Sequence, residues 1–265
     1  MLNAAAAGSE LLGLAGIEDL ILLMAGSLLA GIVRGFTGFG SAMVFLPFAG
    51  AVMPPIWAIT VLAVLDIAGP VLLAPRTARD CDWRDLVRLA AGAVVGLPLG
   101  IMVLRMLPPD LFRYSVSVLS IVLVIFLAAG IRFKGVMNRS MIFGTGGLGG
   151  FLAGSVGLPG PPVMLLYLAS QLPAKAIRAN LFLYLILADF MILAAFALQN
   201  ILFLKPVLIG MVAASSCLFG VMIGAALFDA ERERRYRIVA YLIITATAVG
   251  GLPLFGKLEW TGFAG

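Results

Sequence analysis

The sequence predicts an all-α integral membrane protein of about ten helical segments, arranged as two inverted repeats of five segments each. Three observations carry this prediction. Of the 265 residues, 62% are hydrophobic and only 12% are charged, an apolar share well above that of a soluble domain. Apolar runs follow one another along most of the chain, and the second half repeats features of the first. We therefore expect a single transmembrane domain over residues 1–265.

The composition also excludes several kinds of function. The chain has no histidine, and its two cysteines, Cys81 and Cys217, lie far apart, so we expect no metal site, disulfide or cofactor. No nucleophile–base motif is recognisable, which argues against an enzyme. The basic residues lie in short loops between apolar runs, which indicates membrane orientation rather than nucleic-acid binding. The first seventeen residues lack lysine and arginine, unlike a secretory signal, and are predicted to form a short surface segment.

The two halves of the chain share an ordered series of residues. The stretch "GIVRGFTGFGSAMV" at 31–44 aligns without a gap with "GFLAGSVGLPGPPV" at 150–163. This order predicts a duplication, with repeat one at about 20–131 and repeat two at about 140–256. Further matched pairs are Ala58-Ile59 with Ala176-Ile177, Asp66 with Asp189, Gly96 and Gly100 with Gly220 and Gly224, and Arg113-Tyr114 with Arg235-Tyr236.

Each repeat is expected to contain two short segments followed by three longer ones. The first two segments of each repeat have about 12 to 16 residues, fewer than the roughly 20 that a spanning helix needs. They are predicted to be broken or re-entrant half-helices joined by a glycine turn, and whether they re-enter or cross fully stays open. The segments lie at about 20–34, 41–53, 56–74, 86–105 and 112–131, then at 140–155, 161–172, 177–199, 206–228 and 237–256.

An odd number of segments per repeat means that the second repeat enters the membrane from the opposite side. The distribution of basic residues tests this independently. With the N-terminus outside, thirteen lysines and arginines fall in inner loops and four fall at outer ends, which is the asymmetry of the positive-inside rule. Both termini of the multi-pass chain are therefore predicted outside.

The glycine turns are the candidate anion site. Non-helical backbone at membrane depth must be buried in protein or line a wet cavity, and a helix that starts after such a turn offers N–H groups and the positive end of its dipole. The two inverted tips are expected to face one another across one cavity, although close helix packing is the alternative role for these glycines. The substrate-binding candidates are Gly35, Thr37, Gly38, Gly40 and Ser41 in the first repeat, and Gly154, Ser155, Gly157 and Gly160 in the second.

Arg34 is the most costly residue of the first glycine segment. A lipid-facing arginine costs about 2.5–3.5 kcal/mol on insertion scales, so its side chain should face a cavity or a partner. Its partner could be the anionic substrate, which makes Arg34 a binding candidate. Alternatively, the side chain reaches the membrane interface or pairs with Asp66. The second repeat has Ala153 at the matching position, so one arginine would serve an otherwise symmetric site.

Other polar residues within apolar segments are further candidates. Asp66 and Asp189 recur at matched positions and either couple transport to protons or make structural bonds. Arg178 and Asn180 either line the anion cavity or form ordinary interhelical hydrogen bonds. A different role is expected for Gly92, Gly96, Gly100, Gly220 and Gly224, which recur every four residues and are typical of close helix packing.

The duplicated pattern G-x-x-x-G-x-x-G-x-G, followed by apolar residues and proline, resembles the TauE/SafE family of membrane permeases, described as sulfite exporters. It occurs here as "GIVRGFTGFGSAMVFLP", and the similarity extends over about residues 20–256. The second copy, "GFLAGSVGLPGPPVMLL", departs from the pattern with prolines on both sides of Gly160. The resemblance implies transport of sulfite, organosulfonates such as sulfoacetate or related small sulfur oxyanions, usually outward across the bacterial inner membrane.

These observations together predict a secondary transporter that exports a small anion by alternating access. Its partners would be the anionic substrate and the lipid bilayer. Proton coupling, a homodimer, an anion channel or uniporter, and a membrane subunit of a larger complex all remain open at this stage.

Overall fold

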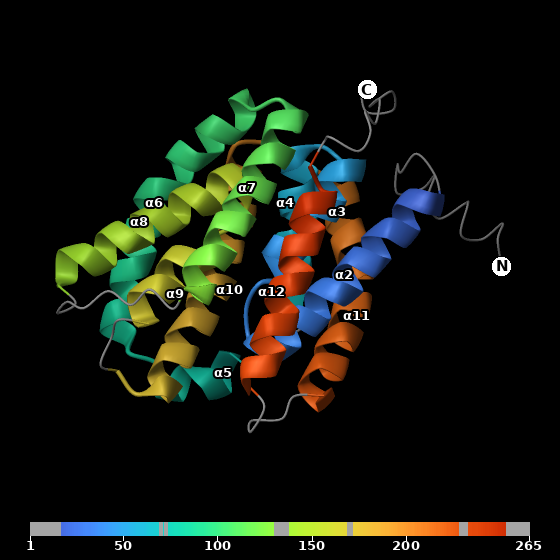
Figure 1. Cartoon of the computed structure of the whole chain (residues 1–265). Helices are drawn as coiled ribbons and strands as arrows, with labels where there is room; N and C mark the ends of the chain where they lie inside the picture. Colours follow the sequence, from blue (N-terminus) through green and yellow to red (C-terminus); the bar gives the residue numbers. More distant parts are fainter. Residues whose placement is uncertain are drawn as a thin grey trace. The chain divides into compact units, whose positions relative to one another are not determined.

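The computed structural model of the chain describes residues 17–68, 71, 74–129, 138–168, 172–227 and 233–252. Every element within these residues is helical (Figure 1). The all-α membrane fold is confirmed, since five of the helices are long and apolar enough to cross a membrane. These are α2 (Ile17–Thr37), α6 (Trp83–Met106), α7 (Pro109–Ala128), α10 (Ala174–Leu198) and α11 (Leu204–Leu227).

Each of the ten predicted segments corresponds to one helix. Two short elements that the sequence did not predict precede α6. The predicted surface segment before Ile17 and the ends of several predicted segments lie outside the described residues. The remaining elements are α3 (Ser41–Val52), α4 (Pro55–Ala68), α5 (Ala74–Thr77), the 3-10 helix η2 (Ala78–Asp80), α8 (Arg139–Val156), α9 (Gly160–Leu168) and α12 (Glu233–Gly250).

The first helix of each half is longer than predicted. α2 has 21 residues and reaches about 31 Å, so the expectation that it would cover only part of the bilayer was wrong. α8 has 18 residues. The prediction treated Gly35 as part of a turn, but Gly35 lies inside α2 and the helix continues to Thr37. The short second helices were predicted correctly, since α3 has 12 residues and α9 has 9.

The chain folds into two compact units, and neither unit coincides with one half of the sequence. Unit 1 contains residues 1–65, 108–120 and 203–265, and unit 2 contains residues 66–107 and 121–202. Unit 1 therefore combines α2 and α3 with α11, the fourth segment of the second half. Unit 2 combines α8 and α9 with α6, the fourth segment of the first half. Such an exchange is compatible with a duplicated chain, whereas the inverted repeats themselves stay a prediction.

In unit 1, glycines let α2 and α11 approach at backbone distance (Figure 1). A Cβ atom on Gly35 would lie 2.7 Å from the Val221 carbonyl oxygen, and one on Gly31 would collide with the Cys217 carbonyl. From the other side, a Cβ on Gly220 would collide with the Leu28 carbonyl. The Ser216 hydroxyl adds a hydrogen bond of 2.9 Å to the Met24 carbonyl across the same contact. These residues stabilise the pair by close packing, as small-residue interfaces do in membranes.

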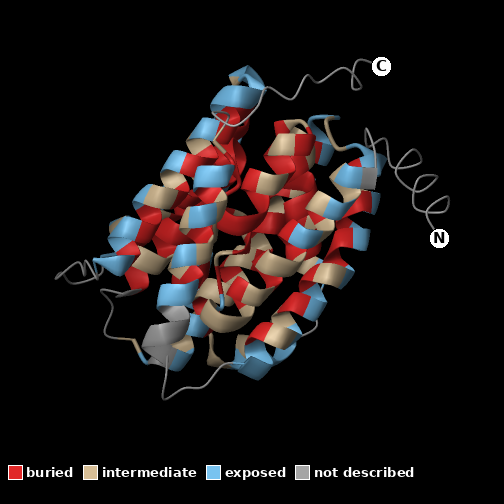
Figure 2. Ribbon diagram, turned by 45° about the vertical axis from the view of Figure 1, so that its right-hand side comes forward, coloured by how far each residue is buried: buried red, intermediate tan, exposed pale blue. Residues whose placement is uncertain are grey.

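In unit 2, α6 and α8 make the equivalent contact, and the predicted packing glycines carry it. Side chains on Gly92, Gly96 and Gly100 would collide with the carbonyls of Phe143, Gly147 and Phe151, one turn after another. An adjacent face of α6 carries the large apolar residues Val95, Leu99 and Met102, which are more than half exposed. Figure 2 shows this division between buried and exposed helix faces. α6 thus turns its glycines to protein and its bulky residues to the surface, where lipid would contact them.

We predict that Gly96→Ala destabilises the protein by about 1–3 kcal/mol, because the added methyl group has no room against the backbone of α8. Thermal unfolding in detergent measures this as a lower Tm. Gly144→Ala is the matched control on α8, since a Cβ there would meet nothing within 4 Å. Equal Tm values for wild type and Gly96→Ala would contradict the packing role.

Candidate functional site

The first helix break lies between α2 and α3 and is formed by two glycines with positive φ. Gly38 has φ 78° and Gly40 has φ 91°, a region that other residues rarely adopt. The Gly38 amide donates to the Arg34 carbonyl at 2.7 Å and closes α2. The Thr37 hydroxyl accepts from the Phe39 amide at 3.3 Å and lies 2.9 Å from the Val33 carbonyl. The tip is therefore a defined turn and not an open loop.

The first turn of α3 receives no side-chain cap. Gly40 occupies the N-cap position and has no side chain to accept from the backbone amides of Ser41, Ala42 and Met43. The first helical bond there is that of the Val44 amide to the Gly40 carbonyl, at 3.3 Å. A helix start of this kind attracts an anion through its N–H groups and its dipole.

The surroundings of this break are partly polar and partly open. Arg34 lies in the last turn of α2 and is 7% exposed, and Ser41 is 4% exposed. Gly38 itself is exposed, and a Cβ added there would meet nothing within 4 Å. Arg34, Thr37, Gly38, Gly40 and Ser41 thus belong to one local structure, as the sequence predicted, while their binding of an anion stays a prediction.

The second break, between α8 and α9, is closed more completely. Gly157 has φ 74°, its amide donates to the Ala153 carbonyl at 3.1 Å, and the Leu158 amide donates to the Leu152 carbonyl at 3.2 Å. The bond from Gly157 to Ala153 is that of an αL helix C-cap. All residues from Gly157 to Val163 are buried. α9 starts with Gly160, but Pro161 and Pro162 have no amide hydrogen, so its first turn offers fewer donors than that of α3.

Three predicted site residues make packing or local contacts at these hairpins. A Cβ on Gly154 would lie 2.5 Å from the Leu97 carbonyl oxygen of α6, which matches the packing of Gly35 on α11. The Ser155 hydroxyl donates to the Phe151 carbonyl at 2.8 Å, within α8. Gly35, Gly154 and Ser155 therefore position the breaks, and any direct role in anion binding stays a prediction.

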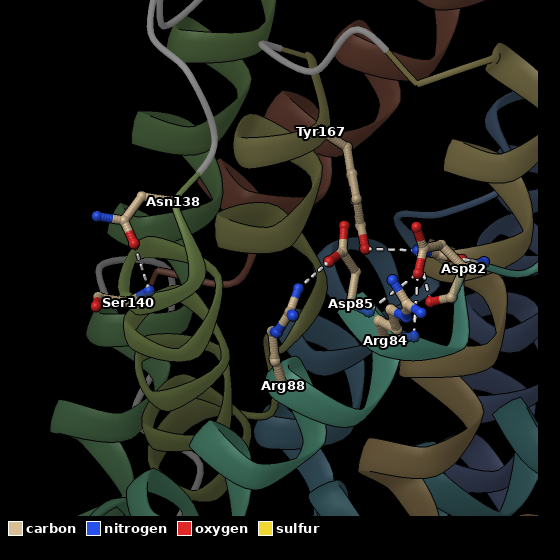
Figure 3. A network of polar contacts seen from close by, with 8 residues as sticks. Asp82, Arg84, Asp85, Arg88, Asn138, Ser140 and Tyr167 are labelled. Atoms are coloured by element: carbon tan, nitrogen blue, oxygen red, sulfur yellow. Dashed lines mark hydrogen bonds and ion pairs between the residues drawn. The ribbon is translucent and has the colours of Figure 1, made fainter.

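Asn180 joins three elements of unit 2. Its side-chain oxygen accepts from the Asp82 amide at 2.8 Å, and its side-chain nitrogen donates to the Tyr167 hydroxyl at 2.8 Å and faces the Asp82 carbonyl at 3.4 Å. Figure 3 shows the Tyr167 ring directed at this corner, beside Asp82 and Asp85. Because both amide hydrogens are engaged, an anion could bind Asn180 only by displacing one of these bonds.

The same corner stabilises the start of α6. The Asp82 carboxylate caps the helix by accepting from the Arg84 amide at 3.0 Å and from the Asp85 amide at 3.3 Å. Asp85 forms an ion pair with Arg88 at 2.9 Å, one turn along the helix (Figure 3). Sequence analysis missed this cluster, although the acidic residues before the first apolar run of α6 are a capping signal.

Arg178 lies at the surface and not at a helix break. It lines a shallow pocket of about 360 Å³ with Arg76, Asp80 and Lys175, and Lys175 forms an ion pair with Asp80 at 3.0 Å. Leu185, which a Cβ on Gly160 would approach to 3.1 Å, is seven residues further along α10, or about 10 Å. The structure therefore separates Arg178 from the second break.

Tyr184 carries an unpartnered hydroxyl at the second hairpin. Its side chain is 1% exposed, and its oxygen has no hydrogen-bond partner within the described part of the chain. It lies over Gly149 of α8, where a Cβ would collide with it, and the same Cβ would lie 3.1 Å from the Pro159 carbonyl oxygen. A buried hydroxyl of this kind marks a place for water or a ligand.

The two predicted coupling residues are both buried. Asp66 is 7% exposed near the end of α4, and Asp189 is 5% exposed within α10. Thr60, one of the neutral polar residues of α4, donates to the Ile56 carbonyl at 2.7 Å within its own helix. A role of the two carboxylates in proton coupling stays a prediction.

Comparison with known proteins places the chain among membrane transporters. A family model described as "Sulfite exporter TauE/SafE" matches residues 23–250. The chain is 26% identical over 153 residues to the probable sulfite/organosulfonate exporter TauE of Cupriavidus necator, a match that covers 56% of this chain and 60% of that protein. The matched region thus spans about 60% of the length of this curated relative. No solved structure matches the chain.

We predict opposite effects for two polar residues of α10. Tyr184→Phe should leave the stability of the anion-free protein unchanged or raise it, because it removes a buried hydroxyl that has no partner among the described residues. Asn180→Ala should destabilise by about 1–3 kcal/mol, because it leaves the Asp82 amide unpaired. Thermal unfolding in detergent compares the two. If Tyr184→Phe lowered the Tm as much as Asn180→Ala, the Tyr184 hydroxyl would have a partner after all.

Proposed function

The chain belongs to the sulfite exporter TauE/SafE family, and we propose that it is a secondary transporter of a small sulfur oxyanion or organosulfonate, such as sulfite or sulfoacetate. Transport runs outward across the bacterial inner membrane by alternating access. The name of the curated relative, a probable sulfite/organosulfonate exporter, supports this substrate class. The multi-pass helical fold agrees with it.

The α2–α3 break is the observation that carries the proposal. It combines an uncapped helix start at Gly40 with the buried Arg34, and Gly38 leaves the approach to the tip unobstructed. Backbone amides and one guanidinium can replace the water shell of a small oxyanion. The α8–α9 break offers fewer amides, and the buried Tyr184 hydroxyl lies beside it.

The membrane potential supplies part of the driving force. A potential that is negative inside favours anion efflux by about 2.3 kcal/mol per charge and 100 mV. Export therefore does not require a coupling ion. We propose that Asp66 and Asp189, both buried in helices, provide proton coupling where the anion gradient opposes export.

Two other functions predict different behaviour in liposomes. A channel or uniporter would give an anion flux that rises without saturation and shows no counterflow. A membrane subunit of a larger complex would give no flux until its partner is added. The proposed transporter gives saturable counterflow of sulfite with the purified chain alone.

We predict that Gly38→Val lowers sulfite counterflow in proteoliposomes by about tenfold or more. Valine disfavours positive φ by about 1–2 kcal/mol, and its branched side chain would enter the open space at the tip. Gly38→Asn should retain more activity, because asparagine tolerates this conformation. Gly144→Val is the control for a bulky residue at an open helical position. Full counterflow in Gly38→Val would place the break outside the transport path.

We predict that Cys81 reacts with a membrane-impermeant maleimide in inside-out vesicles and not in right-side-out vesicles, because both termini are proposed to lie outside. Partial burial and the charge of Asp82 raise the pKa of the Cys81 thiol, so labelling should be slow at neutral pH and faster at alkaline pH. Cys217 is 3% exposed within α11, and Cys81→Ser should abolish labelling. Labelling from the outer side would reverse the proposed orientation.

A further inference from the structure

Three buried polar residues form a stripe on one face of α7. Arg113, Ser117 and Ser120 are spaced by four and three residues, so their side chains point in the same direction. Arg113 is 6% exposed, and both serines are fully buried. We call these three residues the α7 stripe. In the positive-inside count, Arg113 is one of the four basic residues at outer ends.

Three polar atoms of the α7 stripe have no hydrogen-bond partner among the described residues. The Nε atom of Arg113 and the hydroxyl oxygens of Ser117 and Ser120 have no hydrogen-bond partner within the described part of the chain. Arg113 also forms no ion pair with any described carboxylate. A buried guanidinium without a counter-charge is strongly unfavourable, so its retention at this place calls for a negative partner.

The stripe runs beside α3 within unit 1. A Cβ on Gly50 would approach the Arg113 side chain to 3.3 Å. A Cβ on Gly251, just after α12, would lie 2.5 Å from Pro47 and 3.3 Å from the Ser117 hydroxyl oxygen. Arg113 therefore lies near the C-terminal end of α3, and Ser117 lies about one turn closer to the break at Gly40. Glycines at 50 and 251 keep bulky groups away from the stripe.

The helix dipole of α3 compensates only part of this charge. The C-terminal end of a helix carries roughly half a negative charge, which favours a nearby cation such as Arg113. The dipole does not satisfy the Nε–H group or the two serine hydroxyls, which need acceptors or donors at bonding distance. An oxyanion supplies both the missing charge and several acceptor oxygens.

We propose that the α7 stripe is a second anion site, at which Arg113 binds a small sulfur oxyanion and Ser117 and Ser120 donate hydrogen bonds to it. The inference rests on the proposed transport function. Arg113 lies about one turn from the start of α7, and this end of the helix is proposed to face outside. The stripe is thus the release-side station of the exporter, after the anion has left the α2–α3 break.

The test uses the full chain in lipid nanodiscs, titrated with sulfite, sulfate and chloride while thermal unfolding is followed. Sulfite should raise the Tm of the wild type. Arg113→Gln should lose most of this shift and weaken sulfite affinity about tenfold, and Arg113→Lys should restore part of both. Without added anion, Arg113→Gln should be at least as stable as the wild type, because it removes an uncompensated charge. Arg105→Gln, at an exposed arginine, controls for net charge.

The outcomes separate this inference from the proposed function. A sulfite shift that is the same in wild type and Arg113→Gln overturns the second site but leaves the transporter intact. An Arg113→Gln protein that is equally destabilised with and without anion makes the arginine structural and also overturns it. If the wild type transports no sulfite but shows an Arg113-dependent shift with sulfate or chloride, the site stands and the proposed substrate falls.

Discussion

Close backbone contact between helix pairs is the constraint on which the rest of each unit depends. α2 packs on α11 and α6 packs on α8 through glycines whose side-chain positions are filled by the carbonyls of the partner helix. In lipid no hydrophobic force drives helices together, so such contacts depend on van der Waals packing. The helices held most tightly, α2 and α8, are those that end at the breaks. A rigid support of this kind keeps a turn with positive φ in one conformation, which a binding site needs.

Both breaks end a helix within the chain, but they differ in how many backbone amides stay without a cap. Each closes its preceding helix with a glycine amide, at Gly38 and at Gly157. The helices that begin after the two breaks differ, because α3 starts with three amides that Gly40 cannot cap, whereas α9 starts with two prolines and is buried throughout its first turn. If the chain is a duplication, as the sequence predicts, its two breaks are not equivalent. Arg34, which has no arginine counterpart in the second half, lies at the break with more amides, so charge and donors are concentrated in one repeat.

The helices were predictable because apolar run length and glycine or proline punctuation are local signals. The distinction between a turn glycine and a packing glycine was not local. Gly35 and Gly38 look alike in sequence, yet Gly35 contacts α11 and Gly38 has positive φ. Asn180 could not be assigned from sequence either, since its partners are 98 residues earlier and 13 residues earlier. The burial of Arg113 could not be predicted from its position near a helix end, because it depends on α3 packing beside it.

In the proposed transport path, an anion that moves along α3 from its N-terminal to its C-terminal end moves against the electrostatic field of the helix dipole. The N-terminal end of this helix attracts a negative charge, and its C-terminal end repels one. A site formed by the dipole alone would hold the anion at the break and resist its exit toward Gly50. Arg113 lies beside Gly50, and in the proposed second site its charge offsets part of the negative end of the dipole. Transport requires that binding be strong enough for entry and weak enough for release. In the proposed transport path, the cations Arg34 and Arg113 near the two ends of this short helix would serve entry and release respectively.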